Sequence, residues 1–305
     1  MQCGAQECPT RTSLFAQGEK SDFRTSCSGR LHTLNSFSPT PTGRHLHKRN
    51  FTQYSRNMQN ANDDTASSPT IIFEDDDILI IDKPAGLVVH GDGRTEEPSV
   101  ADWVLENYPE LKEVGEPWMN QEGQMIPRPG IVHRLDRNTS GVMVLAKTQE
   151  VFEFLKEQFQ ERNVKKTYRA WVYGAMKEDE GEIDRPIGKS KKDFRKWSAQ
   201  PGSRGEQREA HTAWRLLETR EEGGEKYSLL ELRPTTGRTH QLRVHLKAIH
   251  HPIVCDKLYA PRRKCTFGFG RLALHAHTIT LLAKGNKEQK FEAPLPADFK
   301  AISGS

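Results

Sequence analysis

One aspartate stands between two arginines in the segment His133-Arg134-Leu135-Asp136-Arg137. Apolar residues precede it at 131–132 and follow it at 142–145, so we expect this turn to join two buried strands. A half-buried carboxylate that cations keep ionised can act as a nucleophile. Taken alone, the segment also fits an exposed turn in which an Arg-Asp ion pair contributes almost no stability.

A second segment could supply a rigid cation. Thr239 is a candidate N-cap for a helix near 239–250, and Arg243 lies four residues after it. Leu242 and Leu246 share a face that can pack inward, which leaves Arg243 at the edge of that face. Arg243 could then keep a buried carboxylate charged, because such a carboxylate needs a partner. A basic helix on the surface is the alternative.

Tyr168 belongs to an alternating strand expected at about 167–176, where it shares one face with Ala170 and Val172. A tyrosine in this position can simply pack in the core. It can equally form a platform on which a base stacks, with its hydroxyl near the reacting atoms.

The segment 185–208 contains eight Lys or Arg residues against two acidic ones, together with Phe194, Trp197 and several glycines. Basic groups mixed with aromatic side chains and flexible glycines favour a loop that grips structured RNA. A solvated basic loop is the alternative.

These residues must be positioned by a mixture of strands and helices. We expect strands at 71–73, 78–81, 167–176, 209–219, 227–234 and 271–282, and helices over 99–108, around 152–159 and near 239–250. We expect the stretch 109–130, which is rich in Pro and Gly, to be a loop. Since strand and helix do not alternate regularly, the order indicates an α+β fold with a largely antiparallel central sheet and flanking helices.

Length and composition set the outer limits. The chain has 305 residues, a formal net charge of +4 and a mean hydropathy of −0.76, low for a compact protein of this size. Residues 1–69 are rich in Ser, Thr, Asn, Arg and Gln, so we expect a disordered basic leader before a folded domain over 70–305. The leader could instead be a transit peptide, or translation could begin at Met58. We expect a cytoplasmic protein, or a mitochondrial or plastid one if the leader is a transit peptide.

Several functional classes find no support. No apolar run approaches the length of a membrane-spanning helix, so we expect no membrane association. The five cysteines show no paired spacing, so neither a zinc ribbon nor a disulfide framework is predicted, and a reducing compartment is the simplest inference. The histidine spacings match no common metal motif, and the usual phosphate-binding and serine-hydrolase motifs are absent. We therefore expect no metal.

Three motifs together resemble the RluA-type RNA pseudouridine synthases. They are His133-Arg134-Leu135-Asp136 with Thr139-Ser140-Gly141, then Lys166-x-Tyr168-x-Ala170, then the run from Gly237 to His245. The flanking Asp82-Lys83-Pro84-x-Gly86 and His251-Pro252-Ile253, with Asp256 and Tyr259, are also similar to that family. The resemblance covers about residues 71–283. Cys255 and Ala260 depart from it, since members often carry glycine there, and no trace of the N-terminal RNA-binding module of many members is seen.

The resemblance implies a pseudouridine-synthase-like fold whose central sheet carries an RNA-binding cleft, and the isomerisation of uridine to pseudouridine without a cofactor. It implies that Asp136 is the nucleophile acting on a uridine flipped out of its stack. Tyr168 would stack on the target uracil and assist proton removal, and Arg243 would pair with Asp136. The implied substrate-binding residues are Arg134, which fills the gap left by the uridine, Leu242, which packs against the base pocket, His133, Arg238 and His240.

We expect RNA as the partner, with ribosomal RNA favoured over tRNA, and a monomeric protein. Two rival classes remain. A catalytically silent RNA-binding or assembly protein would require a damaged catalytic motif, whereas Asp136, Tyr168 and Arg243 are all present. A metal hydrolase that uses the histidines would contain bound metal.

Overall fold

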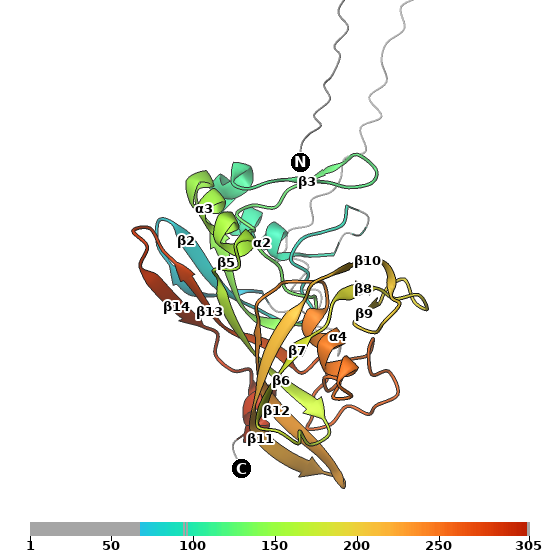
Figure 1. Cartoon of the computed structure of the whole chain (residues 1–305). Coiled ribbons are helices and arrows are strands. Elements are labelled where there is room, and N and C mark those ends of the chain that lie inside the picture. Colours follow the sequence, from blue (N-terminus) through green and yellow to red (C-terminus); the bar gives the residue numbers. More distant parts are fainter. Residues whose placement is uncertain (1–67, 94, 96, 304–305) are drawn as a thin grey trace, which may run out of the picture. The chain divides into compact units, whose positions relative to one another are not determined.

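A nine-stranded sheet forms the centre of the described part of the chain (Figure 1). The computed structural model describes residues 68–93, 95 and 97–303, and all of them lie in one compact unit. The predicted leader over 1–69 therefore lies outside the described residues except for Ser68 and Pro69.

The strands of the central sheet run in the order β1-β2-β5-β13-β6-β12-β11-β7, with β14 paired to β13. Their bounds are β1 Thr70–Glu74, β2 Ile78–Lys83, β5 Ser140–Ala146, β6 Lys165–Tyr173, β7 Glu180–Asp184, β11 His211–Glu222, β12 Glu225–Pro234, β13 Leu274–Leu282 and β14 Glu288–Glu292. Among these strands only β5 and β13 pair in parallel; the other pairs are antiparallel. The mixed, largely antiparallel sheet predicted from the sequence is thus confirmed.

The described helices do not all begin at a side-chain cap. They are α2 Val100–Asn107, the 3-10 turn η1 Pro109–Glu113, α3 Gln149–Gln160, α4 Gln241–Ala248 and α5 Ala297–Ser303. Ser99 and Asp102 form the predicted capping box of α2. The expectation that Thr239 caps the helix near 239–250 was wrong. The N-cap of α4 is His240, which has a left-handed backbone (φ 57°) and makes no side-chain capping bond.

Two segments predicted as loops contain regular structure. The stretch 109–130 holds η1 and a short hairpin of β3 (Trp118–Met119) and β4 (Met125–Ile126). The basic segment 185–208 forms a separate three-stranded sheet of β8 (Ile187–Lys189), β9 (Trp197–Ser198) and β10 (Arg204–Arg208). These strands are too short and too polar for apolar periodicity to reveal them.

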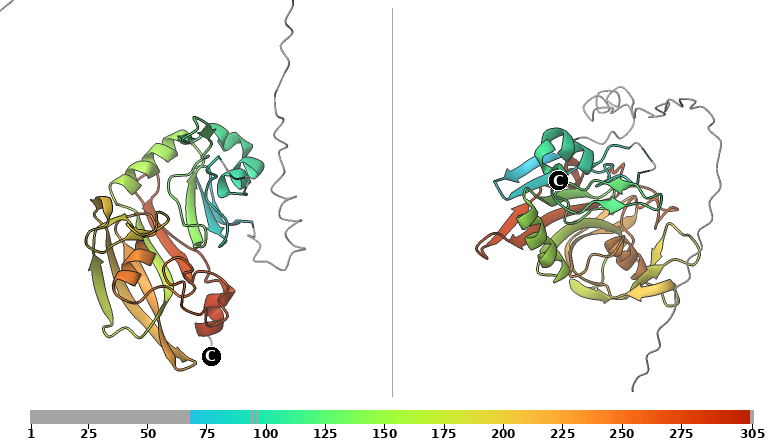
Figure 2. Two further views of the ribbon diagram at one scale, coloured as in Figure 1. Left: turned by 90° about the vertical axis from the view of Figure 1, so that its right-hand side faces the viewer. Right: turned by 90° about the horizontal axis from the view of Figure 1, so that it is seen from above.

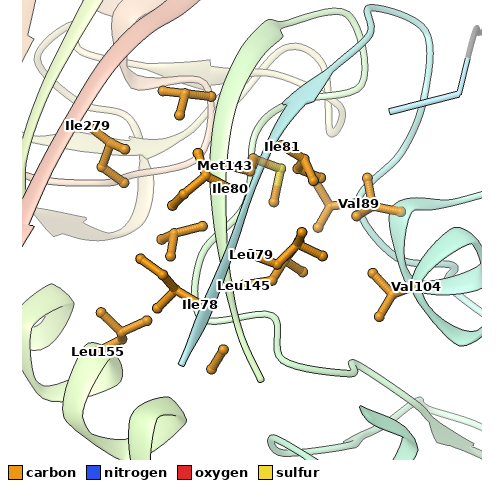
Figure 3. Close-up of a cluster of buried hydrophobic side chains, with 14 of the residues drawn as sticks. Ile78, Leu79, Ile80, Ile81, Val89, Val104, Met143, Leu145, Leu155 and Ile279 are labelled. Carbon is orange, nitrogen blue, oxygen red and sulfur yellow. The ribbon is translucent and has the colours of Figure 1, made fainter. Parts of the chain in front are cut away.

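Two apolar clusters hold the sheet to its helices. One gathers β2 and β5 with α2 and α3, and its side chains interdigitate in Figure 3. The other gathers β6, β12 and β13 with α4. Figures 1 and 2 show α2 and α3 beside β2 and β5, and α4 beside the other half of the sheet. Because Tyr168 packs against both clusters, it lies at the seam between the two halves.

The cysteines differ from expectation. Cys255 and Cys265 form a disulfide, with their Cα atoms 4.8 Å apart. The sequence predicted no disulfide framework, and it gave no sign of this single pair, because the loop that brings the two residues together carries no local motif. No helix in the described ranges is both long enough and apolar enough to span a membrane.

Gly141, at the start of β5, allows an unusually close approach between strands. It lies opposite Ala276 of β13, and Ala276 lies opposite Tyr168 of β6, so the three residues form one row across the sheet. Gly141 has φ 119°, and a Cβ atom there would lie 2.1 Å from the carbonyl oxygen of Ala276. Only glycine permits both the backbone angle and the contact.

We expect Gly141→Ala to lower the free energy of unfolding by about 3 kcal/mol or more, because a backbone atom blocks the new methyl group. Gly285→Ala is the matched control. Gly285 also has a positive φ (82°), but nothing lies within 4 Å of its would-be Cβ atom. Gly285→Ala should lower the free energy of unfolding by only about 1 kcal/mol. Urea unfolding measures both, and equal losses would show that the close approach has no energetic effect.

Candidate active site

A cleft of about 450 Å³ opens where the Asp136 turn, strand β6 and the start of α4 meet. Its walls include every site residue proposed from the sequence, namely Asp136, Tyr168, Arg243, Arg134, Leu242, His133, Arg238 and His240. These residues come from three segments, around 133–136, at 168 and around 238–243, and the first and the last are about a hundred positions apart in the sequence. The fold brings them together. Among the described residues no group of three or more His, Cys, Asp or Glu side chains could hold a metal ion.

Asp136 is half-buried, with 23% of its side chain exposed. The carbonyl oxygen of Asp136 accepts a hydrogen bond from the backbone N–H of Thr139 at 3.0 Å, which closes the turn before β5. Arg243 donates from Nη1 to Asp136 Oδ2 at 3.2 Å. His240 Nε2 lies 3.9 Å from the same oxygen. The segment is therefore a structured wall of a cleft and not an exposed turn.

Arg243 is itself fixed by a second carboxylate. It donates from Nε and Nη2 to the two oxygens of Asp256, at 2.8 and 2.9 Å. The Asp256 side chain is fully buried and also accepts the backbone N–H groups of Leu258 and Tyr259, each at 3.0 Å. Burial alone would lower the pKa of Arg243, but hydrogen bonding and the charges of Asp256 and Asp136 raise it above its ordinary value. Arg243 is thus permanently charged.

Tyr259 contacts both Arg243 of α4 and His240, the N-cap of that helix. Its ring lies 5.0 Å from the guanidinium carbon of Arg243, a stacking contact. Its hydroxyl lies 2.9 Å from His240 Nδ1 and accepts the N–H of Trp197 at 3.0 Å. Burial lowers the pKa of His240 although the charge of Asp136 opposes this, so the ring favours its neutral form.

Tyr168 presents its phenol ring to the cleft beside Asp136. Burial raises the pKa of its hydroxyl well above the ordinary value, and the nearby charge of Asp136 adds to the shift. The phenol is therefore protonated at neutral pH. A protonated phenol can stack and donate a hydrogen bond but cannot accept the proton of a substrate, which favours the stacking role over the role in proton removal.

Lys83 was not proposed from the sequence as a site residue, yet it anchors the Asp136 turn. Its side chain is fully buried, and Nζ donates to the carbonyl oxygens of Pro84, Leu87 and Arg137, at 2.8, 2.8 and 3.1 Å. Burial lowers its pKa to about 7, and the charge of Asp136 opposes part of that fall. Asp256 was also missed as a site residue. For Lys83 the available signal was a charge two positions after the apolar run 78–81, and for Asp256 it was a charge directly after the run 253–255.

The remaining predicted residues play different structural parts. His133 is half-buried, stacks on Phe159 at 4.7 Å and accepts the backbone N–H of Val144 through Nε2 at 3.1 Å. Leu242 packs in the second apolar cluster and also lines the cleft. Arg238 donates from Nε to the carbonyl oxygen of Glu209 at 3.0 Å.

The two arginines that flank Asp136 point to different partners. Arg137 forms an ion pair with Glu97. Arg134 lines the cleft, and its Nη1 lies 3.4 Å from His90 Nε2.

The sequence of this chain is similar to those of known proteins. The family model described as RNA pseudouridylate synthase matches residues 77–248. An uncharacterized RNA pseudouridine synthase of Synechocystis is 39% identical over 233 residues, which cover 76% of this chain and 67% of that protein. Ribosomal large subunit pseudouridine synthase D of Vibrio parahaemolyticus is 35% identical over 250 residues, 76% of this chain and 69% of that protein. The chain thus spans about two thirds of the length of these curated relatives.

Solved structures share the fold. Human RNA pseudouridylate synthase domain containing 4 superposes with a TM-score of 0.57 and 27% identity, covering 76% of this chain and 90% of that one. Human RNA pseudouridylate synthase domain containing 1 gives a TM-score of 0.61 at 24% identity, covering 77% and 87%, a likeness in fold. The fold expected from the sequence motifs is confirmed.

The two carboxylates on Arg243 should differ sharply in their contribution to stability. We expect Asp256→Asn to lower the free energy of unfolding by about 3 kcal/mol, because it leaves a buried guanidinium without its main counter-charge. Asp136→Asn, the same change on the exposed side of Arg243, should cost about 1 kcal/mol or less. Urea unfolding compares them, and equal costs would contradict the unequal burial of the two groups.

His133 should make stability depend on pH. Burial lowers its pKa to about 3 from the ordinary 6.5, so between these values the unfolded chain binds the extra proton. The contribution of the neutral ring is complete above about pH 6.5 and is lost as the pH falls toward the folded pKa. When the pH falls from about 6.5 to about 5, the free energy of unfolding of His133→Gln should therefore decrease by about 2 kcal/mol less than that of the unaltered protein. Urea unfolding across this range tests this, and parallel curves would contradict it.

Proposed function

Because the chain belongs to the RNA pseudouridylate synthase family, we propose that it isomerises uridines of ribosomal RNA to pseudouridine with Asp136 as nucleophile. The observation that carries the proposal is the half-buried carboxylate of Asp136, held at 3.2 Å by an arginine that a second, buried carboxylate fixes in place. An ionised carboxylate with one fixed partner keeps lone pairs free for a reacting atom.

The reaction needs no oxidant, reductant or cofactor, since it is an internal rearrangement. Asp136 attacks C1′ of the ribose and the bond between C1′ and N1 of uracil breaks. The base then turns and C5 displaces the carboxylate from C1′. The proton on C5 leaves to solvent, and N1 takes up a proton from solvent. Positive charge that develops on the sugar is stabilised by the Asp136 carboxylate. Arg243 keeps that carboxylate oriented through its hydrogen bond to Oδ2.

The target uridine must leave its stack to reach the cleft, at a cost of a few kcal/mol. Tyr168 offers a protonated aromatic ring on which the uracil stacks, and Leu242 supplies an apolar wall. Arg134, at the edge of the same cleft, fills the space that the flipped nucleotide leaves in the RNA. His133, Arg238 and His240 complete the walls against which the substrate lies.

A preference for ribosomal RNA is supported by the curated relatives named as ribosomal large subunit enzymes. The basic segment 185–208 supports contact with a structured RNA, since its small sheet exposes 89% of Phe194 among lysines and arginines. Mapping pseudouridines in total RNA from cells with and without the protein identifies the modified positions. Loss of sites in tRNA alone would overturn the ribosomal assignment.

We expect Asp136→Asn to abolish tritium release from RNA that carries tritium at carbon 5 of uridine, a fall of about 10³-fold or more in rate. RNA affinity should remain within about 3-fold, because the change removes one negative charge and little volume. The matched control is Asp184→Asn, the same change at an exposed position of β7, which should keep full activity. Full tritium release by the Asp136 variant would contradict the mechanism. No release by the unaltered protein would favour a silent RNA-binding protein.

A further inference from the structure

The β3–β4 hairpin carries a second cluster of cationic and aromatic side chains beside the cleft. The guanidinium carbon of Arg128 lies 5.1 Å from the centre of the Trp118 ring. Trp118 in turn lies 6.4 Å from the ring of His90, whose Nε2 meets Arg134 at 3.4 Å. Since Arg134 lines the cleft, these contacts form one continuous row from the hairpin to the candidate active site. Figure 1 shows the hairpin at the opposite end of the molecule from the β11–β12 turn.

The charges in this row are not neutralised. Within the described ranges neither Arg128 nor Arg134 forms an ion pair with a carboxylate, and the Nε of Arg128 is buried without a hydrogen-bond partner. Burial lowers the pKa of Arg128, and the charge of Arg134 adds to this, so the two cations repel each other. Such a concentration of positive charge is unfavourable unless an anion completes it.

His90 fixes the geometry of the row. Its Nδ1 lies 3.0 Å from the carbonyl oxygen of Gly91, to which it donates, and this leaves Nε2 as an acceptor for the N–H of Arg134. Burial lowers the pKa of His90, and both neighbouring arginines add to the shift, so the ring is neutral when it accepts this bond. The orientation of Arg134 is thus set before any ligand arrives.

The hairpin surface around Trp118 is apolar and open. The exposed fractions are 37% for Trp118, 61% for Met119 and 54% for Met125. An arginine that merely covered a tryptophan would gain only about 1 kcal/mol. The stacking of one arginine on Trp118 does not explain why the two guanidinium groups of Arg128 and Arg134 lie close together here. A flat aromatic surface next to unpaired cations is instead suited to a nucleic-acid strand, whose bases stack while its phosphates bind the cations.

We propose that Arg128, stacked on Trp118 and next to Arg134, binds a backbone phosphate of the substrate RNA next to the flipped uridine. The inference rests on the proposed function, because a strand that delivers a nucleotide into the cleft must place its neighbouring phosphates at the cleft edge. Arg128 supplies the phosphate contact and Trp118 stacks beneath an adjacent base. The hairpin is thereby a second point of RNA attachment, separate from the 185–208 segment.

The salt dependence of RNA binding tests this directly. We expect Arg128→Ala to weaken binding of a fluorescein-labelled RNA hairpin about 10-fold, and to reduce the slope of log K against log salt by about 0.9, the value for one phosphate contact. Arg128→Lys should keep the slope and lose only part of the affinity, since it retains the charge but not the planar stack. Trp118→Ala should weaken binding about 10-fold with an unchanged slope.

Lys226→Ala is the control, because it removes the same charge from an exposed position at the far β11–β12 turn. It should change neither affinity nor slope. In tritium release, Arg128→Ala should raise KM about 10-fold and leave kcat unchanged. An unchanged slope in Arg128→Ala, or an equal effect of Lys226→Ala, would overturn the phosphate site. If the unaltered protein bound RNA in this way but released no tritium, the site would stand and the proposed activity would fail.

Discussion

The position of Arg243 between two carboxylates is the constraint on which the candidate site depends. Asp256 takes two of its N–H groups from the buried side, and Asp136 takes the third from the side of the cleft. A buried guanidinium needs a counter-charge with good hydrogen-bond geometry, which Asp256 supplies. Arg243 is thereby held in one orientation, with Nη1 directed at the Asp136 carboxylate.

The sheet supplies the precision that this arrangement requires. Gly141, Ala276 and Tyr168 form one row across three strands, so the start of β5, just beyond the Asp136 turn, is held two strands from the phenol ring. Helix α4 brings Arg243 to the same place from the other half of the sheet. Lys83 then ties the turn to the segment after β2 through three carbonyl oxygens. Each of these supports lies on a regular element or against one, which keeps the cleft geometry rigid.

The sequence could predict the parts of this structure that local patterns encode. The capping box of Ser99 and the apolar runs of β2 and β5 each carry their own signal. The partner of Arg243 on its buried side could not be predicted, because Asp256 reaches it through a long-range contact that no periodicity marks. Nor could the Cys255–Cys265 pairing, the left-handed cap at His240 or the short β3–β4 hairpin. Motif order located the cleft residues, but only the fold shows which of them touch.

The distribution of charge around the cleft is compatible both with RNA binding and with the proposed role of Asp136 as nucleophile. The RNA backbone is an anion, and it would be repelled by an exposed Asp136. Arg243 forms an ion pair with that carboxylate, most of which is buried, and Arg134 lines the cleft. Neither Arg134 nor Arg128, which stacks on Trp118, forms an ion pair with a carboxylate of the described residues. In the proposed reaction, attraction acts on the phosphates at the edge, while the uncharged uracil enters the interior. A neutral His240 beside Asp136 leaves Arg243 as the strong partner of the carboxylate, so that lone pairs remain for the proposed substrate.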